Sequence, residues 1–278
     1  MYFRPSTLQE AVTTLATHGG QILSGGTDFY PTLGERPVLH TVVDVSAVSE
    51  LRGIFFEPDH IRIGGLTTWT NLLCTPLPRC FDALKAAARE VGSVQIQNRG
   101  TVAGNLCNAS PAADGVPPLL ALDAEVDLVS QSRTRRLPLR NFIFGNRKTA
   151  RHPDEILAHI IIPRGLDDAR SAFLKLGSRR YLVISIVMVA AVVQVDDVGR
   201  VSQARVAVGS CSAVARRLHA LENSLVGTQA ELGLGNVASP EHLDVLSAID
   251  DVRATANYRR DAALTLVRRA IEACVEAH

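Results

Sequence analysis

The sequence predicts an α+β protein with more than one domain, and three observations support this fold class. The chain has 278 residues, enough for two domains or three small ones that each bury a core. Hydrophobic residues make up 46% and charged residues 21%, as is typical of folded globular proteins rather than disordered ones. Helical and strand patterns alternate in the first half, and three antiparallel strands followed by helices are predicted in the second.

The N-terminal segment predicts a small α/β unit that ends near residue 57. Ser6 and Gln9 have the spacing of a capping box, which would begin an amphipathic helix that ends at Gly19. Two short apolar runs, 21–23 and 41–45, predict strands on either side of a glycine-containing turn. The order helix, strand, turn, strand is typical of an α/β unit.

The middle of the chain predicts a second unit with one long irregular stretch. Its expected elements, in order, are a strand at 61–64, a helix capped near Thr68, a helix at about 82–91, a helix at 119–122 and strands at 125–129 and 156–162. Residues 92–114 are polar, contain glycine and show no obvious element. A connection of that length usually has a function.

Beyond Pro163 the pattern predicts a compact α+β C-terminal domain. Three antiparallel strands are expected between residues 171 and 208, the last two joined by a turn at 196–199. Helices are expected at 214–225, 240–252 and 258–275. The predicted domains are therefore 1–57, 58–168 and 169–278.

Composition excludes several classes of function. The formal net charge is +1, which removes the usual electrostatic reason to expect nucleic acid or an anionic membrane as a partner. The longest apolar stretch, 181–195, is shorter than the roughly 20 residues that span a bilayer, so no membrane insertion is expected. Five scattered cysteines without a Cys-x-x-Cys pair predict no disulfide framework and no metal site. With no secretory signal in the N-terminal residues, the expected location is cytoplasmic.

The strongest local signal is the run Ile22-Leu23-Ser24-Gly25-Gly26-Thr27-Asp28. A strand that leads into two glycines exposes consecutive backbone N–H groups, which can form a concave site for phosphate. Glycine suits such a site because a Cβ atom would hold phosphate oxygens away from the backbone. The alternative interpretation is that Gly25-Gly26 forms only a tight turn.

A second polar loop extends from Asn98 to Asp114, and it concentrates hydroxyl, amide and glycine residues between apolar elements. Asp114 is expected either to cap the next helix or to accept a hydrogen bond from a ribose hydroxyl, as in dinucleotide sites. Two phosphate-type loops some 75 residues apart fit a diphosphate that is held from two sides.

The run Gly233-Leu234-Gly235-Asn236-Val237-Ala238 matches the dinucleotide fingerprint G-x-G-x-x-A, but its context does not. No strand is expected before it, and the next helix is expected to start after the motif rather than within it. We interpret it as a loop. Hydrolase and kinase motifs are also missing from the sequence, so no catalytic side chains are proposed.

Taken together, these loops resemble the FAD-binding medium subunit of molybdenum hydroxylases, the xanthine dehydrogenase and carbon monoxide dehydrogenase family. The resemblance extends over almost the whole chain. Its motifs are Ser24-Gly25-Gly26-Thr27-Asp28, Gly65-Leu66-Thr67-Thr68, Asn98 to Asn105, Asn108 to Asp114, Arg147 to Ala150, Glu155-Ile156-Leu157, and the stretch from Asp251 through Tyr258-Arg259-Arg260 to Ala270. Each motif is weak alone, and their joint order makes the match specific.

The resemblance implies two α/β subdomains of the vanillyl-alcohol-oxidase-like (PCMH-like) type that bind FAD, followed by a smaller α+β C-terminal domain with a three-stranded antiparallel sheet and helices. The FAD-binding residues that it implies are Ile22, Leu23, Ser24, Gly25, Gly26, Thr27, Asp28, Thr67, Thr101, Val102, Ala103, Gly104, Asn105, Asn108, Ala109, Asp114, Leu157, Phe173 and Lys175. Gly25 and Gly104 would lie in the two pyrophosphate loops. Asp114 would lie near the sugar portion, and Leu157, Phe173 and Lys175 near the flavin.

The resemblance also implies electron transfer as the activity. FAD would receive electrons from 2Fe–2S clusters on a small iron–sulfur subunit and pass them to an acceptor such as NAD. The molybdenum cofactor would lie on a large partner subunit, and Lys175 would stabilise reduced flavin. One departure from the family pattern is Ala103, which replaces the usual first glycine of the second loop. Two alternatives stay open: a flavin-poor scaffold or assembly subunit of the same fold, and a stand-alone flavin oxidase.

Overall fold

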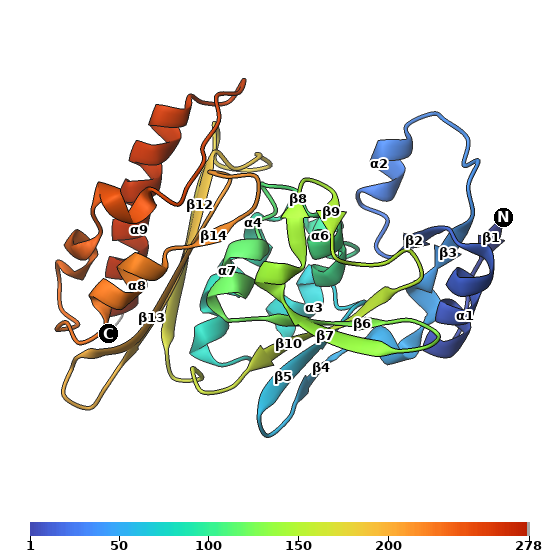
Figure 1. Cartoon of the computed structure of the whole chain (residues 1–278), viewed down its shortest axis with the longest axis horizontal. Helices are drawn as coiled ribbons and strands as arrows, with labels where there is room; N and C mark the ends of the chain where they lie inside the picture. Colours follow the sequence, from blue (N-terminus) through green and yellow to red (C-terminus); the bar gives the residue numbers. More distant parts are fainter. Residues whose placement is uncertain (277–278) are drawn as a thin grey trace. The chain divides into compact units, whose positions relative to one another are not determined.

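The computed structural model describes residues 1–276, and the chain divides into two compact units. The first unit comprises Met1–Thr75, Ser93–Ala109 and Ala124–Pro163, and the second comprises Pro76–Gly92, Ser110–Asp123 and the chain from Arg164 onward. Each unit is therefore assembled from segments far apart in the sequence, whereas the predicted domains are continuous stretches. Figure 1 labels most of the helices and strands of both units.

The first unit begins with a parallel three-stranded sheet in the order β1-β3-β2. Its strands are β1 (Tyr2–Phe3), β2 (Gln21–Leu23) and β3 (Val42–Asp44). Helix α1 (Leu8–His18) packs its apolar face into a buried cluster that includes Val43 of β3. The predicted order of helix and strands in this segment is confirmed.

The N-cap of α1 is Thr7, so the predicted capping box at Ser6 is wrong by one residue. The Thr7 hydroxyl accepts the N–H of Glu10 at 3.1 Å, which is the first half of a T-x-x-E capping motif. The Glu10 carboxylate accepts the backbone N–H of Ser6 at 2.8 Å, which holds Ser6 outside the helix. The glutamate three residues after Thr7 thus decides where the helix begins.

A five-stranded antiparallel sheet forms the rest of the first unit, in the order β4-β5-β10-β6-β7. Its strands are β4 (Ile54–Phe56), β5 (His60–Gly64), β10 (Ile156–Pro163), β6 (Glu125–Val129) and β7 (Thr134–Pro138). A small hairpin joins β8 (Ile143–Gly145) to β9 (Lys148–Thr149). The edge strands β4 and β7 were not predicted, because they are short and one is mostly exposed while the other is mostly polar.

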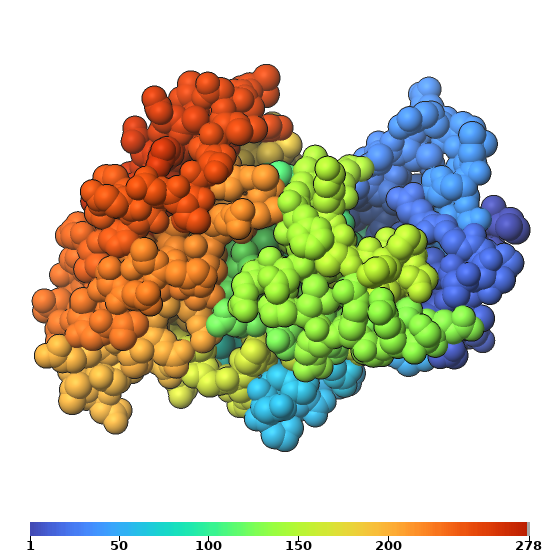
Figure 2. Space-filling view, in the orientation of Figure 1, coloured from blue at the N-terminus to red at the C-terminus, as the bar shows by residue number. Residues whose placement is uncertain are grey.

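Short helices complete the first unit: α2 (Phe29–Leu33), α3 (Trp69–Cys74), α5 (Val94–Gln97) and α6 (Val102–Asn108). Single 3₁₀ turns lie at η1 (Val45–Ala47), η2 (Ser49–Leu51) and η4 (Leu139–Asn141). The expectation of no element within 92–114 is therefore wrong, since α5 and α6 are too short to show a helical period. Residues 29–40 around α2 are largely exposed, and they stand at the surface in Figure 2.

The second unit is built on an antiparallel sheet in the order β11-β12-β13-β14. Its three long strands are β11 (Arg170–Leu176), β12 (Val187–Val195) and β13 (Val201–Gly209), as predicted. A fourth strand of two residues, β14 (Arg216–Arg217), adds to the expected three. This strand occupies the start of the helix expected at 214–225, and helix α8 covers only His219–Leu225.

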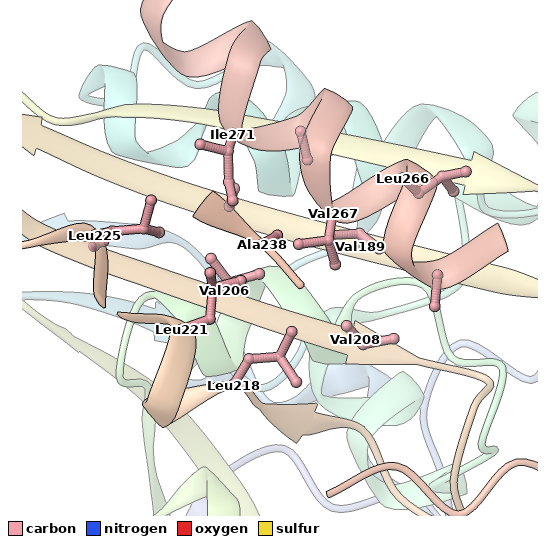
Figure 3. Close-up of a cluster of buried hydrophobic side chains, with 14 of the residues drawn as sticks. Val189, Val206, Val208, Leu218, Leu221, Leu225, Ala238, Leu266, Val267 and Ile271 are labelled. Atoms are coloured by element: carbon pink, nitrogen blue, oxygen red, sulfur yellow. The ribbon is translucent and has the colours of Figure 1, made fainter. Parts of the chain in front are cut away.

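Helices cover both faces of this sheet. On one face α8 and α9 (Ala256–Glu276) enclose a buried hydrophobic cluster, which includes Val189 and Val206 from the sheet and Val267 from α9 (Figure 3). The alternate residues of β12 point to the other face, where α4 (Asp82–Glu90) and α7 (Val116–Ala121) pack. A 3₁₀ turn, η3 (Arg79–Phe81), precedes α4.

The helix expected at 240–252 is wrong, because only a 3₁₀ turn, η6 (Pro240–Leu243), forms there. The side chain of Asp251 accepts the backbone N–H groups of Arg253 and Ala254, and such local bonds compete with a helix. Val252, at the end of the expected helix, is 98% exposed, so burial does not favour a helix at that end of the segment. Among residues 1–276, no helix is both long and apolar enough to cross a bilayer.

Candidate functional site

The first glycine loop, Ser24–Asp28, joins the end of β2 to the start of α2 in the first unit. Gly26 has φ +77°, a left-handed conformation that favours glycine. Within residues 1–276, the backbone N–H groups of Gly25, Gly26 and Thr27 have no hydrogen-bond acceptor. Consecutive N–H groups of this kind form a concave site for anions.

Gly25 brings the two polar loops into direct contact. A Cβ atom at Gly25 would lie 2.1 Å from the carbonyl oxygen of Arg99, which real side chains never do. The hydroxyl groups of Ser24 and Thr101, one from each loop, are 3.2 Å apart and share a hydrogen bond. The structure therefore brings together the two loops that the sequence analysis paired.

The second loop ends at the N-terminus of α6, where Thr101 is the N-cap. Its hydroxyl accepts the N–H of Gly104 at 3.0 Å, and its carbonyl accepts the N–H of Asn105 at 3.1 Å. A Cβ at Gly104 would lie 2.8 Å from this same hydroxyl oxygen, which explains the glycine. The N–H of Ala103 has no acceptor among the described residues, so the alanine that departs from the family pattern still offers its donor.

Two further expected residues of the first unit have internal structural partners. Thr67 is buried, its hydroxyl donates to the carbonyl of Gly53 at 3.0 Å, and its own carbonyl accepts the N–H of Val102 at 3.0 Å. The backbone of Leu157 in β10 lies against Gly65, where an added Cβ would come within 2.4 Å of the Leu157 carbonyl oxygen. Both residues therefore contact backbone of the first unit: Thr67 at Gly53 and Val102, and Leu157 at Gly65.

Helix α6 also carries an unusual polar group. The side-chain Oδ1 of Asn105 is buried and has no hydrogen-bond partner within residues 1–276. Burying such an acceptor without a partner costs free energy, so it indicates a ligand that supplies a donor. Asn108 is the last residue of the helix, and Ala109 ends it in a left-handed conformation with φ +49°.

The remaining expected residues belong to the second unit. Asp114 is buried, and Lys175 of β11 donates to its Oδ2 at 2.7 Å. Ser185 donates to the other oxygen, Oδ1, at 2.7 Å. Burial raises the pKa of the Asp114 carboxyl above its ordinary value, while the Lys175 ammonium and the Ser185 hydroxyl act against that rise.

Asp114 is not a helix cap, because the N-cap of α7 is Gly115 and no side chain caps that helix. Lys175 and Phe173 lie on the same face of β11, opposite the α9 face that Leu174 and Leu176 contact. The charge of Lys175 is compensated by Asp114, with which it forms an ion pair whose side chains are 6% and 9% exposed. Ser185 was not predicted; its only signal is a serine within the apolar stretch 181–195.

The run Gly233–Ala238, which matches the dinucleotide fingerprint, differs from these loops in its hydrogen bonds. The N–H groups of Gly233 and Gly235 donate to the Glu272 carboxylate at 3.1 and 2.8 Å. The motif folds as a 3₁₀ turn, η5 (Leu234–Val237), packed on α9. The rejection of a dinucleotide site there is consistent with this arrangement, since its donors already have an acceptor.

The described part of the chain shows no cluster of side chains suited to metal binding or thiol chemistry. Residues 1–276 contain no group of three or more His, Cys, Asp or Glu side chains arranged to hold a metal. Burial raises the pKa of Cys80 to about 12 and that of Cys107 to about 11, which keeps both thiols protonated.

Comparison with known proteins identifies the family. Residues 1–165 match the model of the FAD binding domain in molybdopterin dehydrogenase, and residues 172–274 match the CO dehydrogenase flavoprotein C-terminal domain. The chain belongs to this family. It is therefore a medium, FAD-binding subunit of the molybdenum hydroxylase type and an oxidoreductase, and its cofactor is FAD.

Individual relatives match over nearly their whole length. The nicotinate dehydrogenase FAD-subunit of Eubacterium barkeri is 34% identical, over 94% of this chain and 90% of the relative. The xanthine dehydrogenase FAD-binding subunit of Escherichia coli O157:H7 is 31% identical, over 99% and 96%. The structure of reconstituted CO dehydrogenase from Oligotropha carboxidovorans superposes with a TM-score of 0.92 at 25% identity, covering 100% of this chain and 98% of that one. These structural likenesses confirm the predicted fold class.

Proposed function

We propose that this chain is the electron-transfer subunit of a heteromeric molybdenum hydroxylase, acting between a small iron–sulfur subunit and an external acceptor such as NAD. A large molybdenum-cofactor subunit completes the proposed assembly, in the cytoplasm. The names of the relatives support this proposal, since they are FAD subunits of nicotinate and xanthine dehydrogenases.

The observation that carries the proposal is the set of backbone donors in the first unit. Gly25, Gly26, Thr27 and Ala103 present N–H groups with no acceptor in residues 1–276, and the two loops that carry them touch. A diphosphate has the charge and the number of oxygens to accept from both loops. We therefore assign the FAD diphosphate to Ser24–Asp28 and Thr101–Asn105.

When bound, FAD supplies the redox chemistry, and the chain supplies binding, orientation and electrostatics. The side-chain Oδ1 of Asn105, which has no donor within residues 1–276, would accept from a hydroxyl or ring N–H of the cofactor. We assign a flavin-tuning role to Lys175, whose ammonium has three donors and uses two of them, for Asp114 at 2.7 Å and for the Glu90 carbonyl at 3.5 Å. No side chain of the chain is proposed to act as a catalytic acid or base.

The absorption spectrum of the purified protein tests FAD binding. We expect a yellow protein with one FAD per chain, or a colourless one that takes up FAD on mixing. A colourless preparation that cannot be reconstituted would instead support the flavin-poor scaffold. The Ala103 N–H disfavours that alternative, because the methyl group leaves the donor in place.

Co-purification tests the partners separately. Expression with the neighbouring genes and a tag on this chain should recover a chain containing iron–sulfur clusters and a chain containing molybdenum. Recovery of a yellow single chain that oxidises an organic substrate without partners would support the stand-alone oxidase and contradict the proposed assembly.

A further inference from the structure

Arg259, in the first turn of α9, is a buried arginine in the second unit. Its side chain is 3% exposed, so its charge must be compensated by neighbouring acceptors. One terminal nitrogen, Nη1, donates to the carbonyl of Ile186 at 2.6 Å and to the carbonyl of Ser210 at 3.0 Å. These carbonyls lie just before β12 and just after β13, so one guanidinium group ties together the ends of two strands.

Both tied segments lead to Asp114. Ile186 follows Ser185, whose hydroxyl donates to Asp114 Oδ1 at 2.7 Å. The N–H of Ser210 donates to the carbonyl of Pro111, three residues before Asp114, at 3.1 Å. Through its two carbonyl contacts, Arg259 is thus connected both to a partner of the Asp114 carboxylate and to the backbone that carries it.

A third connection leads to Lys175. The N–H of Ile186 donates to the carbonyl of Leu176 at 2.8 Å, and Leu176 is the neighbour of Lys175 in β11. Displacing Ile186 therefore moves groups on both sides of the Asp114–Lys175 ion pair. Buried ion pairs depend strongly on geometry, because each charge has lost its hydration.

The other end of the guanidinium is held by Asp251, which accepts from Nη2 at 2.7 Å. Asp251 also accepts the N–H groups of Arg253 and Ala254, at 2.8 and 3.2 Å. The backbone hydrogen bond from Arg253 and the Arg259 guanidinium hold the pKa of Asp251 well below its usual range, so this anchor stays ionised near neutral pH.

We propose that Arg259 is a positioning residue that fixes the geometry of the Asp114–Lys175 pair from the far side of the sheet. The planar guanidinium suits this role because it directs several N–H groups to fixed acceptors at once, which a lysine ammonium on a flexible stem does less well. Its effect on the flavin rests on the proposed function, whereas its effect on the ion pair does not.

The ammonium group of Lys175 gives a direct readout. The chain has only three lysines, Lys85, Lys148 and Lys175, so their ammonium signals can be assigned individually by NMR with labelled lysine. A buried ammonium in a fixed ion pair exchanges its protons slowly with water, so we expect an observable signal for Lys175. Ser185→Ala, which removes one partner of Asp114, should weaken or abolish that signal.

The decisive variants are Arg259→Lys and Asp251→Asn, the second of which leaves the buried arginine in place. We expect both to abolish the Lys175 signal while circular dichroism shows a folded protein. The matched control is Arg260→Gln, at the next residue of α9. It breaks the exposed ion pair between Arg260 and Asp244 and should leave the Lys175 signal intact. If folded Asp251→Asn and Arg259→Lys both keep the wild-type signal, Arg259 is not a positioning residue.

The reduction potential of the FAD-loaded chain provides the second readout. Asp251→Asn should shift the potential in the same direction as Ser185→Ala, and Arg260→Gln should not shift it. If Asp251→Asn loses the Lys175 ammonium signal but keeps the wild-type reduction potential, Lys175 does not tune the flavin. The positioning role of Arg259 would still be supported. Failure of the wild-type chain to bind FAD would refute the proposed function, and the ammonium signal would still decide the inference.

Discussion

Two glycine-rich runs in this chain, Gly25-Gly26 and Gly233-Leu234-Gly235, use glycine for different purposes. In both, a glycine approaches a carbonyl oxygen so closely that a Cβ would clash: that of Arg99 for Gly25 and that of Arg268 for Gly235. The N–H groups differ. Those of Gly233 and Gly235 donate to Glu272, whereas those of Gly25 and Gly26 have no acceptor within residues 1–276.

The comparison shows that a glycine motif alone does not identify a binding site. Close backbone packing requires glycine in both runs. The two runs differ only in whether their backbone N–H groups already have an acceptor within the described residues. Glu272 supplies in the second unit the negative charge that we assign to a diphosphate in the first. A carboxylate held by two backbone N–H groups is thus an internal counterpart of the proposed ligand.

Substitution of Gly25 should have the largest effect. Its Cβ would lie 2.1 Å from the Arg99 carbonyl oxygen, so the two loops must separate. Such overpacking costs about 1–3 kcal/mol, which predicts a roughly 5- to 150-fold weaker FAD affinity for Gly25→Ala and complete loss of retained FAD for Gly25→Val. Flavin absorbance after gel filtration measures retention.

The matched control for Gly25 is Gly145→Ala, because an added Cβ there meets nothing within 4 Å in the same unit. It should retain FAD as the wild type does. Full flavination of Gly25→Val would show that the Ser24–Asp28 loop does not bind the diphosphate.

Gly235→Ala should affect stability and spare the cofactor. A Cβ would lie 2.4 Å from the Arg268 carbonyl oxygen in α9, so we expect a loss of about 1–3 kcal/mol in the free energy of unfolding. FAD affinity should not change, because the motif already uses its donors internally. Denaturant unfolding and FAD titration of the same variant separate the two effects, and a large loss of FAD affinity would contradict our rejection of this motif.

Thr101→Val should have a smaller and mixed effect. It removes the N-cap of α6, which costs about 1 kcal/mol, and it breaks the bond to Ser24 between the loops. We expect FAD affinity to fall together with stability. Thr7→Val, which removes the N-cap of α1 in the same unit, should cost similar stability without weakening FAD binding. Equal FAD affinity in the two variants would exclude Thr101 from the site.

Much of this arrangement could be predicted from local sequence. The three long strands of the second unit have clear apolar periodicity, and the helix at Thr68 has a side-chain cap, so both were correct. The pairing of the Ser24–Asp28 loop with the Asn98–Asp114 loop could also be predicted, because each loop has its own sequence signal. The helix start at Thr7 was missed because Ser6 and Thr7 both fit a capping pattern. They are distinguished by Glu10, whose backbone N–H donates to Thr7 and whose carboxylate accepts the N–H of Ser6.

Long-range contacts could not be predicted in the same way. The bonds of Asp114 to Lys175 and Ser185 join residues 61 and 71 positions apart, and no local pattern specifies them. The role of Arg259 depends on carbonyl groups, which every residue has, so sequence carries no signal for its partners. The helix expected at 240–252 failed for a different, local reason, because the Asp251 side chain accepts the backbone N–H groups of Arg253 and Ala254.

Ala103→Gly should have the smallest effect and sharpens the comparison most directly. The residue lies in the first turn of α6, where its N–H is available whether or not a methyl group is present. Glycine in a helix costs up to about 1 kcal/mol relative to alanine, so a modest loss of stability is expected, with FAD affinity within roughly threefold of the wild type. A tenfold gain in affinity would instead show that the methyl group obstructs the diphosphate. In that case, absence of a Cβ at this position would matter as much as the available donor, as it does at Gly25.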